Sequence, residues 1–291
     1  MHDNEASRTA YPTYRREPSP KRCRNHYRGP LGRVCVGNLN ARWVMKSAIE
    51  FQNLTLAYNL IPVVQDLETN IPEGSLTAVV GPNGAGKSSL FKGIIGSLKP
   101  RSGRVVFANS SRRGFAYLPQ LSEIDRTFPL SVIDLVAMGL WREIGSFGKL
   151  TGPQYARVEA AIAAVGLTGF EKRVIGSLSG GQMQRALFAR LLLQDAHLVL
   201  LDEPFTAIDE KSISDLVRVI HAWHEEGRTI IAALHDQDLV KQHFPDTLML
   251  AREMVAHGAT GHVLTSENQL KAREMCEACI GSPHVCGRGV A

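Results

Sequence analysis

The 291-residue chain lacks any long run of apolar residues. No stretch approaches the ~18 consecutive apolar residues that a bilayer-spanning helix requires. The first twenty residues, MHDNEASRTAYPTYRREPSP, also lack the apolar core of a secretory signal. We therefore expect a chain that neither crosses a membrane by itself nor is exported.

Net charge is concentrated at one end of the chain and nearly absent elsewhere. Residues 1–44 contain nine lysines and arginines and three acidic residues, a balance of +6. Residues 45–291 contain 24 basic and 25 acidic residues. Because this larger part is close to neutral, its charge gives no reason to expect nucleic-acid binding.

Cysteine is sparse, with five residues in the whole chain. This number favours a reducing cytosol over a disulfide framework in a chain of this size. The composition, 44% hydrophobic and 21% charged, is that of an ordinary globular protein. At ~150 residues per domain, the length suggests about two domains.

Residues 1–44 are rich in Arg, Pro and Asn and have little apolar periodicity. Such a segment cannot bury enough surface to offset the entropy of ordering it, so we predict that it is disordered. An alternating strand pattern, MKSAIEFQNLTLAY, begins at Met45. We favour Met45 as the biological start, and a basic tail that contacts anionic lipid is the alternative.

Short apolar segments alternate with helical patterns from residue 47 onward. We predict strands at 75–80, 114–118, 198–201 and 229–234, and helices at 87–97, 131–145 and 153–166. This alternation predicts an α/β fold with a parallel sheet buried on both faces. The sequence has no internal repeat and no heptad pattern.

A glycine-rich loop lies between the first of these strands and the first helix. It reads GPNGAGKS at 81–88, which matches the pattern G-x-x-x-x-G-K-[ST]. Glycines allow the loop to wrap around phosphates, whose charge meets backbone N–H groups and the helix dipole. Lys87 would reach the β- and γ-phosphates and Ser88 would bind Mg²⁺. The alternative, a plain glycine turn, is disfavoured by the strand-loop-helix context.

The strand LVLL at 198–201 is followed by two carboxylates, Asp202 and Glu203. Asp202 would hold Mg²⁺ through water, and Glu203 could polarise an attacking water as a general base. A solvated acidic pair would be the better interpretation of this segment alone. Because the same chain contains a phosphate loop, the catalytic interpretation of the two carboxylates is favoured.

Gln120 and His235 each follow a predicted strand. Ligands bind outside the carboxyl ends of the strands in an open parallel sheet, so both side chains would face one crevice. A lone Gln or His after a strand more often has no special role, but their shared position favours both as sensors of a γ-phosphate.

A second glycine-rich helix start, LSGGQ at 178–182, has no lysine. The phosphate loop, Gln120, LSGGQ, LVLLDE at 198–203 and His235 occur in the order and spacing of ATP-binding cassette (ABC) ATPases. The chain resembles this family over roughly residues 46–265. Members that act in translation carry two cassettes, and DNA-maintenance members insert a long coiled coil. This chain shows neither feature.

The resemblance implies a P-loop NTPase core with a parallel sheet flanked by helices, an antiparallel β subdomain and an α-helical signature subdomain at about 121–185. It implies ATP and Mg²⁺ as cofactors, with the ion held by Ser88, Gln120 and Asp202. Glu203, His235 and Gln120 would be catalytic, and Gln120 would also link the nucleotide to a membrane partner. The implied nucleotide-binding residues are Tyr58, which would stack on adenine, and Gly81, Pro82, Asn83, Gly84, Ala85, Gly86, Lys87, Ser88 and Ser89.

ABC ATPases work as head-to-tail dimers in which the signature segment of one subunit closes the ATP site of the other. The resemblance therefore implies that Ser179, Gly180, Gly181 and Gln182 act in trans, which explains why this helix start needs no lysine. Asp209, in FTAID, would lie in the loop through which the two sites communicate.

Two stretches, EIDRTFPLSVIDLVAMG and ALHDQDLVKQHFPDTLML, resemble the zinc and manganese importers within this family. This implies an ATPase subunit on the cytoplasmic face of the inner or plasma membrane, where it powers metal uptake, of zinc first and manganese second. Its partners would be a second copy, two integral membrane permease subunits and a periplasmic or extracellular metal-binding solute receptor. The alternatives are an iron-chelate or vitamin B12 importer and a separate-subunit exporter.

The C-terminal segment 266–291 contains Cys276, Cys279, His284 and Cys286. Thiolates and an imidazole at this spacing could form a tetrahedral zinc site. We favour a frayed tail with reduced cysteines, because Cys-x-x-Cys is not followed by a second matched pair.

Overall fold

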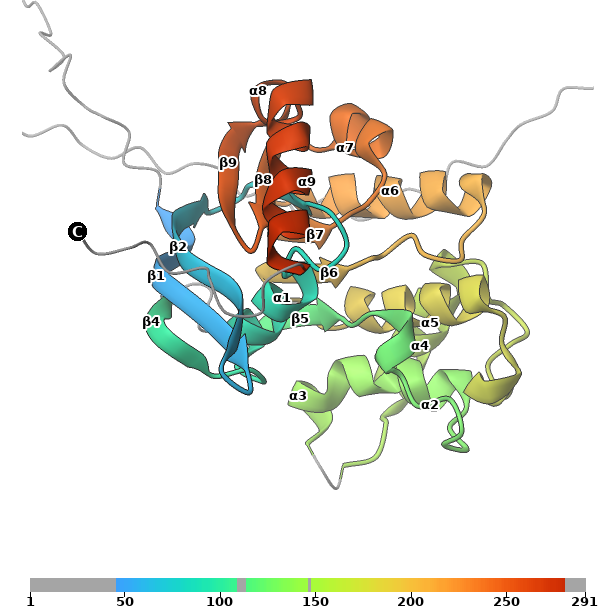
Figure 1. Ribbon diagram of the computed structural model, residues 1–291. Coiled ribbons are helices and arrows are strands. Elements are labelled where there is room, and N and C mark those ends of the chain that lie inside the picture. The colour runs from blue at the N-terminus through green and yellow to red at the C-terminus, as the bar shows by residue number, and fades with distance from the viewer. Residues whose placement is uncertain (1–45, 109–113, 146–147, 281–291) are drawn as a thin grey trace, which may run out of the picture. The chain divides into compact units, whose positions relative to one another are not determined.

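A computed structural model describes residues 46–108, 114–145 and 148–280 (Figure 1). The predictions for the basic segment 1–44, for a start at Met45, and for His284 and Cys286 concern residues outside this described part.

The larger of two sheets has six strands in the order β5-β6-β7-β3-β8-β9. Five of them are mutually parallel, and β9 pairs antiparallel with β8. The strands are β3 (Leu76–Val80), β5 (Phe115–Leu118), β6 (Leu198–Asp202), β7 (Thr229–Ala233), β8 (Asp246–Ala251) and β9 (Glu253–Ala259). The four strands predicted from short apolar runs agree with the observed bounds within one residue at each end.

The central strands of this sheet are buried on both faces. Successive residues of β6 alternate between two hydrophobic clusters: Leu198 and Leu200 belong to one, and Val199 and Leu201 to the other. Because side chains alternate across a strand, each face needs its own cover of helices or strands. This requirement explains why the segment contains no polar residue until Asp202.

The smaller sheet is antiparallel, in the order β2-β1-β4. Its strands are β1 (Ser47–Tyr58), β2 (Ile61–Pro72) and β4 (Pro100–Phe107). Its buried side chains, Phe51 and Leu56 among them, share a cluster with Phe91 of helix α1 and with one face of the larger sheet. Helix α1 (Lys87–Ile95) lies between the two sheets (Figure 1), and the predicted antiparallel β subdomain is confirmed.

Helix α1 ends two residues earlier than predicted. Gly96 is its C-cap with φ of 80°, and the Gly96 N–H donates to the Gly93 carbonyl at 3.3 Å. Glycine adopts this left-handed conformation without the steric cost of a side chain, so the helix stops there.

A group of short helices lies between β5 and β6 in the chain, where the α-helical signature subdomain was predicted. They are η2 (Leu121–Glu123), α2 (Val132–Ala137), η3 (Met138–Leu140), α3 (Trp141–Ile144), α4 (Gly152–Ala164), η4 (Ile175–Ser177) and α5 (Gly180–Leu192). Ser131 caps α2 by accepting a hydrogen bond from the Asp134 N–H. These helices cover one end of the larger sheet (Figure 1).

The predicted helix 131–145 is divided into α2, η3 and α3, and Gly139 shows why. A Cβ atom at Gly139 would lie 2.3 Å from the carbonyl oxygen of Arg190 on α5. The chain approaches α5 so closely here that regular packing of one straight helix is interrupted. The backbone changes to a tighter 3-10 turn around this contact.

The remaining helices are α6 (Glu210–Glu225), α7 (Gln237–His243), α8 (Thr260–Val263) and α9 (Ser266–Ile280). A frayed tail was favoured from residue 266, and the structure corrects this for residues 266–280. They form α9, which buries Ala272 and Cys276 in the larger core cluster. The two buried side chains are small and four residues apart, so the apolar signal for this helix is weak.

Candidate active site

The phosphate loop joins β3 to α1, as the motif predicts. Gly86 stands at the N-cap of α1 with φ of 97°. A Cβ atom there would lie 2.3 Å from the Val63 carbonyl oxygen of β2. The left-handed conformation and this close approach both require glycine. No side chain caps α1, so its first N–H groups are available for an anion.

Lys87 is almost fully buried at the start of α1, with 6% of its surface exposed. Its ammonium group donates to the carbonyl oxygens of Gly81 at 2.8 Å and Pro82 at 3.2 Å. Burial lowers the pKa of Lys87, and the nearby Glu203 and Asp202 carboxylates oppose this shift. The side chain thus turns into the loop, where the phosphates of a nucleotide would lie.

Ser88 and Asp202 meet beside the loop. The Ser88 Oγ donates to Asp202 Oδ1 at 3.2 Å, while Oδ2 of this fully buried carboxylate has no hydrogen-bond partner among the described residues. Burial raises the pKa of Asp202 to about 6, and the bond from Ser88 opposes this. A buried carboxylate oxygen beside a hydroxyl supplies the hard oxygen ligands that Mg²⁺ prefers, so these residues fit the ion.

The Glu203 carboxylate is contacted by two residues from other segments of the chain, Gln120 and His235. Glu203 Oε1 lies 2.8 Å from His235 Nε2, and Glu203 Oε2 accepts a bond from Gln120 Nε2 at 2.9 Å. Burial alone would raise the pKa of Glu203, but the hydrogen bonds with His235 and Gln120 outweigh it and hold the pKa below its usual range. The lowered pKa favours the anionic form of Glu203, which is the form that a general base requires.

The direction of the Glu203 side chain depends on an uncommon backbone conformation. Glu203 has φ of 50°, which is rare for a residue with a side chain, and its N–H donates to the Ala233 carbonyl at 3.2 Å. The chain turns sharply after Asp202, so the two neighbouring carboxylates face different partners. Such strained positions cluster at functional sites.

Thr206 is a member of this cluster that motif analysis missed. Its Oγ1 donates to Glu203 Oε2 at 3.3 Å, beside the bond from Gln120. In the sequence, its position three residues after Glu203 was the clue that could have identified it. In the structure, the turn is closed by a bond from the Thr206 N–H to the Glu203 carbonyl at 3.3 Å.

The signature segment, residues 178–182, begins helix α5. Ser179 is the N-cap, and its side chain and that of Gln182 form a reciprocal capping box. Gly180 and Gly181 lie against the segment after Glu203, where a Cβ atom at Gly180 would come within 2.9 Å of Ala207 Cβ. Larger residues would therefore push this segment away.

Known proteins match this chain as follows. The ABC transporter family model matches residues 64–206. A manganese transport system ATP-binding protein of Listeria monocytogenes is 39% identical over 75% of this chain and 93% of its own length. A zinc transport system ATP-binding protein of Treponema pallidum is 40% identical over 76% of this chain and 84% of its own.

The chain belongs to the ABC transporter family. It is an ATP-binding subunit and an ATPase of that family. A solved structure described as an ABC transporter of metal-chelate type, in an inward-facing conformation, is 30% identical. The match has a TM-score of 0.67 and covers 78% of this chain and 88% of that one. The predicted ABC fold is confirmed.

The structure also describes two other predicted site residues of this ABC ATPase, Tyr58 and Asp209. Tyr58 is the last residue of β1 and 43% exposed, which leaves its ring accessible to an adenine. Asp209 caps α6 by accepting bonds from the Ser212 N–H at 3.4 Å and Oγ at 2.8 Å, and the Oγ bond is the main cause of its lowered pKa. Their roles in stacking and communication stay predictions.

Gln184 links helix α5 of the ATPase to the segment that follows Glu203, and the sequence motifs did not identify it. The side chain is fully buried, and its Nε2 donates to the Pro204 carbonyl at 2.9 Å. Pro204 follows Glu203 directly. A polar residue inside LSGGQMQRALFA, at a position that faces the core, is the signal that could have found it.

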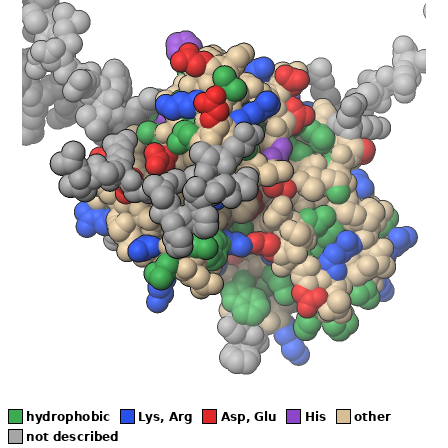
Figure 2. Space-filling model, viewed as in Figure 1, with side chains coloured by type: hydrophobic (Ala, Val, Ile, Leu, Met, Phe, Trp, Pro, Cys, Tyr) green, Lys and Arg blue, Asp and Glu red, His purple; other side chains and the backbone are tan. Residues whose placement is uncertain are grey.

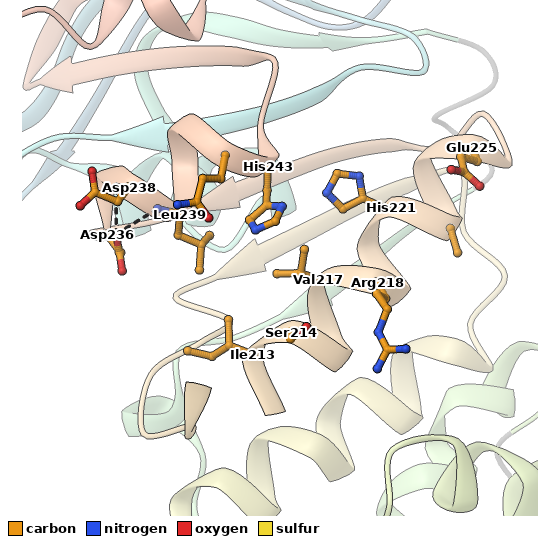
Figure 3. A pocket seen from close by; sticks show the side chains of 12 residues that line it. Ile213, Ser214, Val217, Arg218, His221, Glu225, Asp236, Asp238, Leu239 and His243 are labelled. Atoms are coloured by element: carbon orange, nitrogen blue, oxygen red, sulfur yellow. Dashed lines mark hydrogen bonds between the residues drawn. The ribbon is translucent and has the colours of Figure 1, made fainter. Parts of the chain in front are cut away.

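A pocket of about 690 Å³ lies between α6 and α7, and none of the site residues described above lines it (Figure 3). His221 and His243 point toward one another across it, with ring centroids 5.5 Å apart. Burial, and then the nearby His243, lowers the pKa of His221. Within the described part of the chain, no three His, Cys, Asp or Glu side chains are placed to hold a metal ion.

The C-terminal cysteines are only partly within the described residues. Cys276 is buried on α9, whereas His284 and Cys286 lie outside the described residues. The described residues therefore do not test the zinc site, which was the less favoured alternative for this segment. Among the described residues, no helix is long and apolar enough to cross a membrane.

Proposed function

We propose that this ATPase powers the uptake of a divalent metal, with zinc as the first candidate and manganese as the second. The observation that carries the catalytic part is the Glu203 carboxylate, held by Gln120 and His235 beside the phosphate loop. The metal is supported by the zinc and manganese transport relatives described above.

Nucleotide binding begins at the phosphate loop. The phosphates of ATP would lie against the N–H groups at the start of α1, and Lys87 would exchange the Gly81 and Pro82 carbonyls for phosphate oxygens. Asp202 and Ser88 would hold Mg²⁺, which neutralises charge on the β- and γ-phosphates when bound. The exposed ring of Tyr58 would stack on the adenine.

The hydrolytic step depends on Glu203. Its carboxylate would orient and polarise the attacking water, while His235 would contact the γ-phosphate. Gln120 donates to Glu203 through Nε2, which leaves its Oε1 for the ion that Ser88 and Asp202 would hold. One amide can therefore report nucleotide occupancy to the general base.

The complete site would contain a second copy of the chain. The hydrogen bonds of Ser179 and Gln182 described above stay within the start of their own helix. The Ser179 hydroxyl and the dipole of α5 would close over the γ-phosphate held by the partner's Lys87 and Glu203. Asp209, at the start of α6, lies in the segment that would connect the two sites.

The helices that follow Gln120 would dock on two membrane permease subunits. Hydrophobic side chains reach the surface over this part of the molecule (Figure 2). The exposed ones there are Phe128, Met138, Trp141, Tyr155 and Val174. Exposed apolar side chains gathered in one region mark interaction surfaces. The assembly would place the ATPase on the cytoplasmic face of the membrane, with a metal-binding solute receptor on the other side.

The decisive experiment measures the content of each metal in cells whose only copy carries Lys87→Ala, grown with metal limiting. Selective loss of zinc supports zinc import, and loss of manganese changes the substrate but keeps the mechanism. Lys99→Ala, an exposed charge just beyond α1, is the matched control. If every metal stayed at the level of the control, metal import would be refuted.

Import of a metal chelate is the second candidate function. The 30% identical structure described as metal-chelate type favours it. Uptake of labelled iron chelate that fails in Lys87→Ala cells while zinc and manganese stay constant would select this candidate.

A further inference from the structure

The segment after Gln120 is paired by its backbone with the loop that leads into the signature. The Val132 N–H donates to the Arg173 carbonyl, and the Ile175 N–H donates to the Leu130 carbonyl, each at 2.9 Å. Ser131 and Val174 form an antiparallel bridge between these bonds. The two stretches therefore form a short antiparallel ladder.

Arg126 extends this ladder to the first residue of the signature. Its guanidinium donates to the carbonyl oxygen of Leu178, which directly precedes Ser179, and lies 3.5 Å from the Ile175 carbonyl oxygen. The Arg126 Nε is buried without a partner among the described residues. A cation held against carbonyl oxygens in a part-buried site forms stronger bonds than a neutral donor.

Gly176 shows how closely the two stretches approach. A Cβ atom at Gly176 would lie 2.8 Å from the carbonyl oxygen of Arg126, so any side chain would force the backbones apart. Gly176 is not in a left-handed conformation. The close approach of Arg126, and not the backbone conformation, therefore requires glycine at this position.

A second link leaves the same segment at Glu123. This carboxylate lies 2.6 Å from Lys92 Nζ on α1, and about a third of each side chain is exposed. Surface ion pairs contribute little to stability because water and salt screen them. The Arg126 guanidinium, by contrast, bonds to a carbonyl of the buried Leu178.

We propose that Arg126 is a positioning residue that couples the docking segment to the signature, through the Leu178 carbonyl. The proposal rests on the proposed function, in which the exposed Phe128 lies at the permease contact, two residues from Arg126. Movement of this segment would shift Ser179 toward or away from the partner's nucleotide. Arg126 itself touches no reacting atom, so it acts on turnover and not on nucleotide binding.

The test separates ATP affinity from turnover in the purified full chain. Arg126→Met should lower kcat by about ten-fold, because the charge-assisted bonds are lost, and should leave the affinity for a fluorescent ATP analogue within about two-fold. Arg126→Lys should recover part of kcat. Arg173→Met removes an exposed guanidinium that stacks on Phe170, 4.0 Å from the ring centroid, and should change neither quantity.

Gly176→Ala attacks the same contact from the opposite side. It should lower kcat as Arg126→Met does, and the double variant should be no slower than Arg126→Met alone, since neighbouring changes to one contact are not additive. The proposal is overturned if kcat of Arg126→Met stays within about two-fold of the unaltered chain. It is also overturned if nucleotide affinity falls as much as kcat, which would indicate general destabilisation.

These outcomes are independent of the metal measurement. If unaltered cells show no metal import but Arg126→Met still loses kcat selectively, the proposed function fails and the positioning role stands. If import is intact and Arg126→Met is unchanged in kcat, only the positioning role fails.

Discussion

The two glycine-rich helix starts of this ATPase differ in how they treat their own backbone. At α1 no side chain caps the helix, and the buried Lys87 bonds to carbonyls of the loop. At α5 the Ser179 and Gln182 side chains satisfy backbone N–H groups of their own helix, and no lysine is present. The first start leaves backbone N–H groups uncapped for phosphates, and the second is capped by its own side chains, as we propose for a helix that contacts a phosphate held by the partner subunit.

The two helix starts also differ in their exposure to water. Lys87 is 6% exposed and lies beside Asp202 and Glu203. Ser179 is exposed, and the glycines after it lie against Ala207. The electrostatic interactions that drive chemistry are stronger where water is excluded. The comparison therefore predicts that changes at the first start weaken both ATP binding and turnover, and that changes at the second reduce turnover without weakening ATP binding by the single chain.

The largest expected effect is that of Glu203→Gln. Removing the base should reduce ATP turnover by about 10²- to 10⁴-fold. ATP should still bind, and the variant should accumulate as a stable dimer, which size-exclusion chromatography with ATP and Mg²⁺ would detect. Glu225→Gln, an exposed change on α6, is the control. A monomer with full turnover would disprove the role given to Glu203.

Lys87→Ala should have the next largest effect. Loss of a charge-assisted partner of the phosphates should weaken ATP affinity by roughly ten- to a hundred-fold, measured by titration of a fluorescent analogue. Ser179→Ala, at the other helix start, should leave the affinity of the single chain unchanged. Equal affinity in Lys87→Ala and the unaltered chain would remove the distinction between the two starts.

Asp202 predicts a pH dependence of stability. Its folded pKa, about 6, lies above the usual 3.8. The folded state therefore binds the proton more tightly, so this contribution to stability is fully present below about pH 4 and is lost as pH rises through about 6. Asp202→Asn should flatten the unfolding free energy between these values, measured by urea titration without nucleotide. The exposed Asp195→Asn should keep the slope, and a slope kept in Asp202→Asn would contradict the assignment.

The smallest effect concerns the caps. Ser179→Ala and Thr151→Ala each remove the hydroxyl of a capping box, on α5 and α4, and each should lower the unfolding free energy by about 1 kcal/mol. Only Ser179→Ala should also reduce ATP turnover. Comparable turnover in the two variants would show that the signature serine is a cap alone.

Spacing along the chain was enough to predict the parts of the site that are contiguous. Lys87 and Ser88 follow the glycines at the start of α1, and Asp202 ends a fully apolar strand, because a parallel sheet delivers such residues to one edge. The approximate bounds of the central strands followed from the same apolar runs. These features depend on local backbone geometry, which neighbouring residues determine.

Other features depend on segments that are distant in sequence. Thr206 reaches Glu203 only because the chain turns sharply after β6, and Gln184 bonds to Pro204 across the contact of α5 with the catalytic segment. Helix α9 was missed because it buries the small side chains of Ala272 and Cys276. Arg126 lies in the stretch EIDRTFPLSVIDLVAMG, but nothing in that stretch indicates its bond to the Leu178 carbonyl.

The amino-acid sequence by itself determined the family and the phosphate loop and predicted the catalytic groups, because each is encoded in a short stretch with its own pattern. The tertiary structure decided which groups share the Glu203 carboxylate, where the 131–145 helix breaks, and how the docking segment is joined to the signature. The physical reason is that hydrogen bonds and close packing between distant segments are set by the whole fold, and no local pattern specifies them.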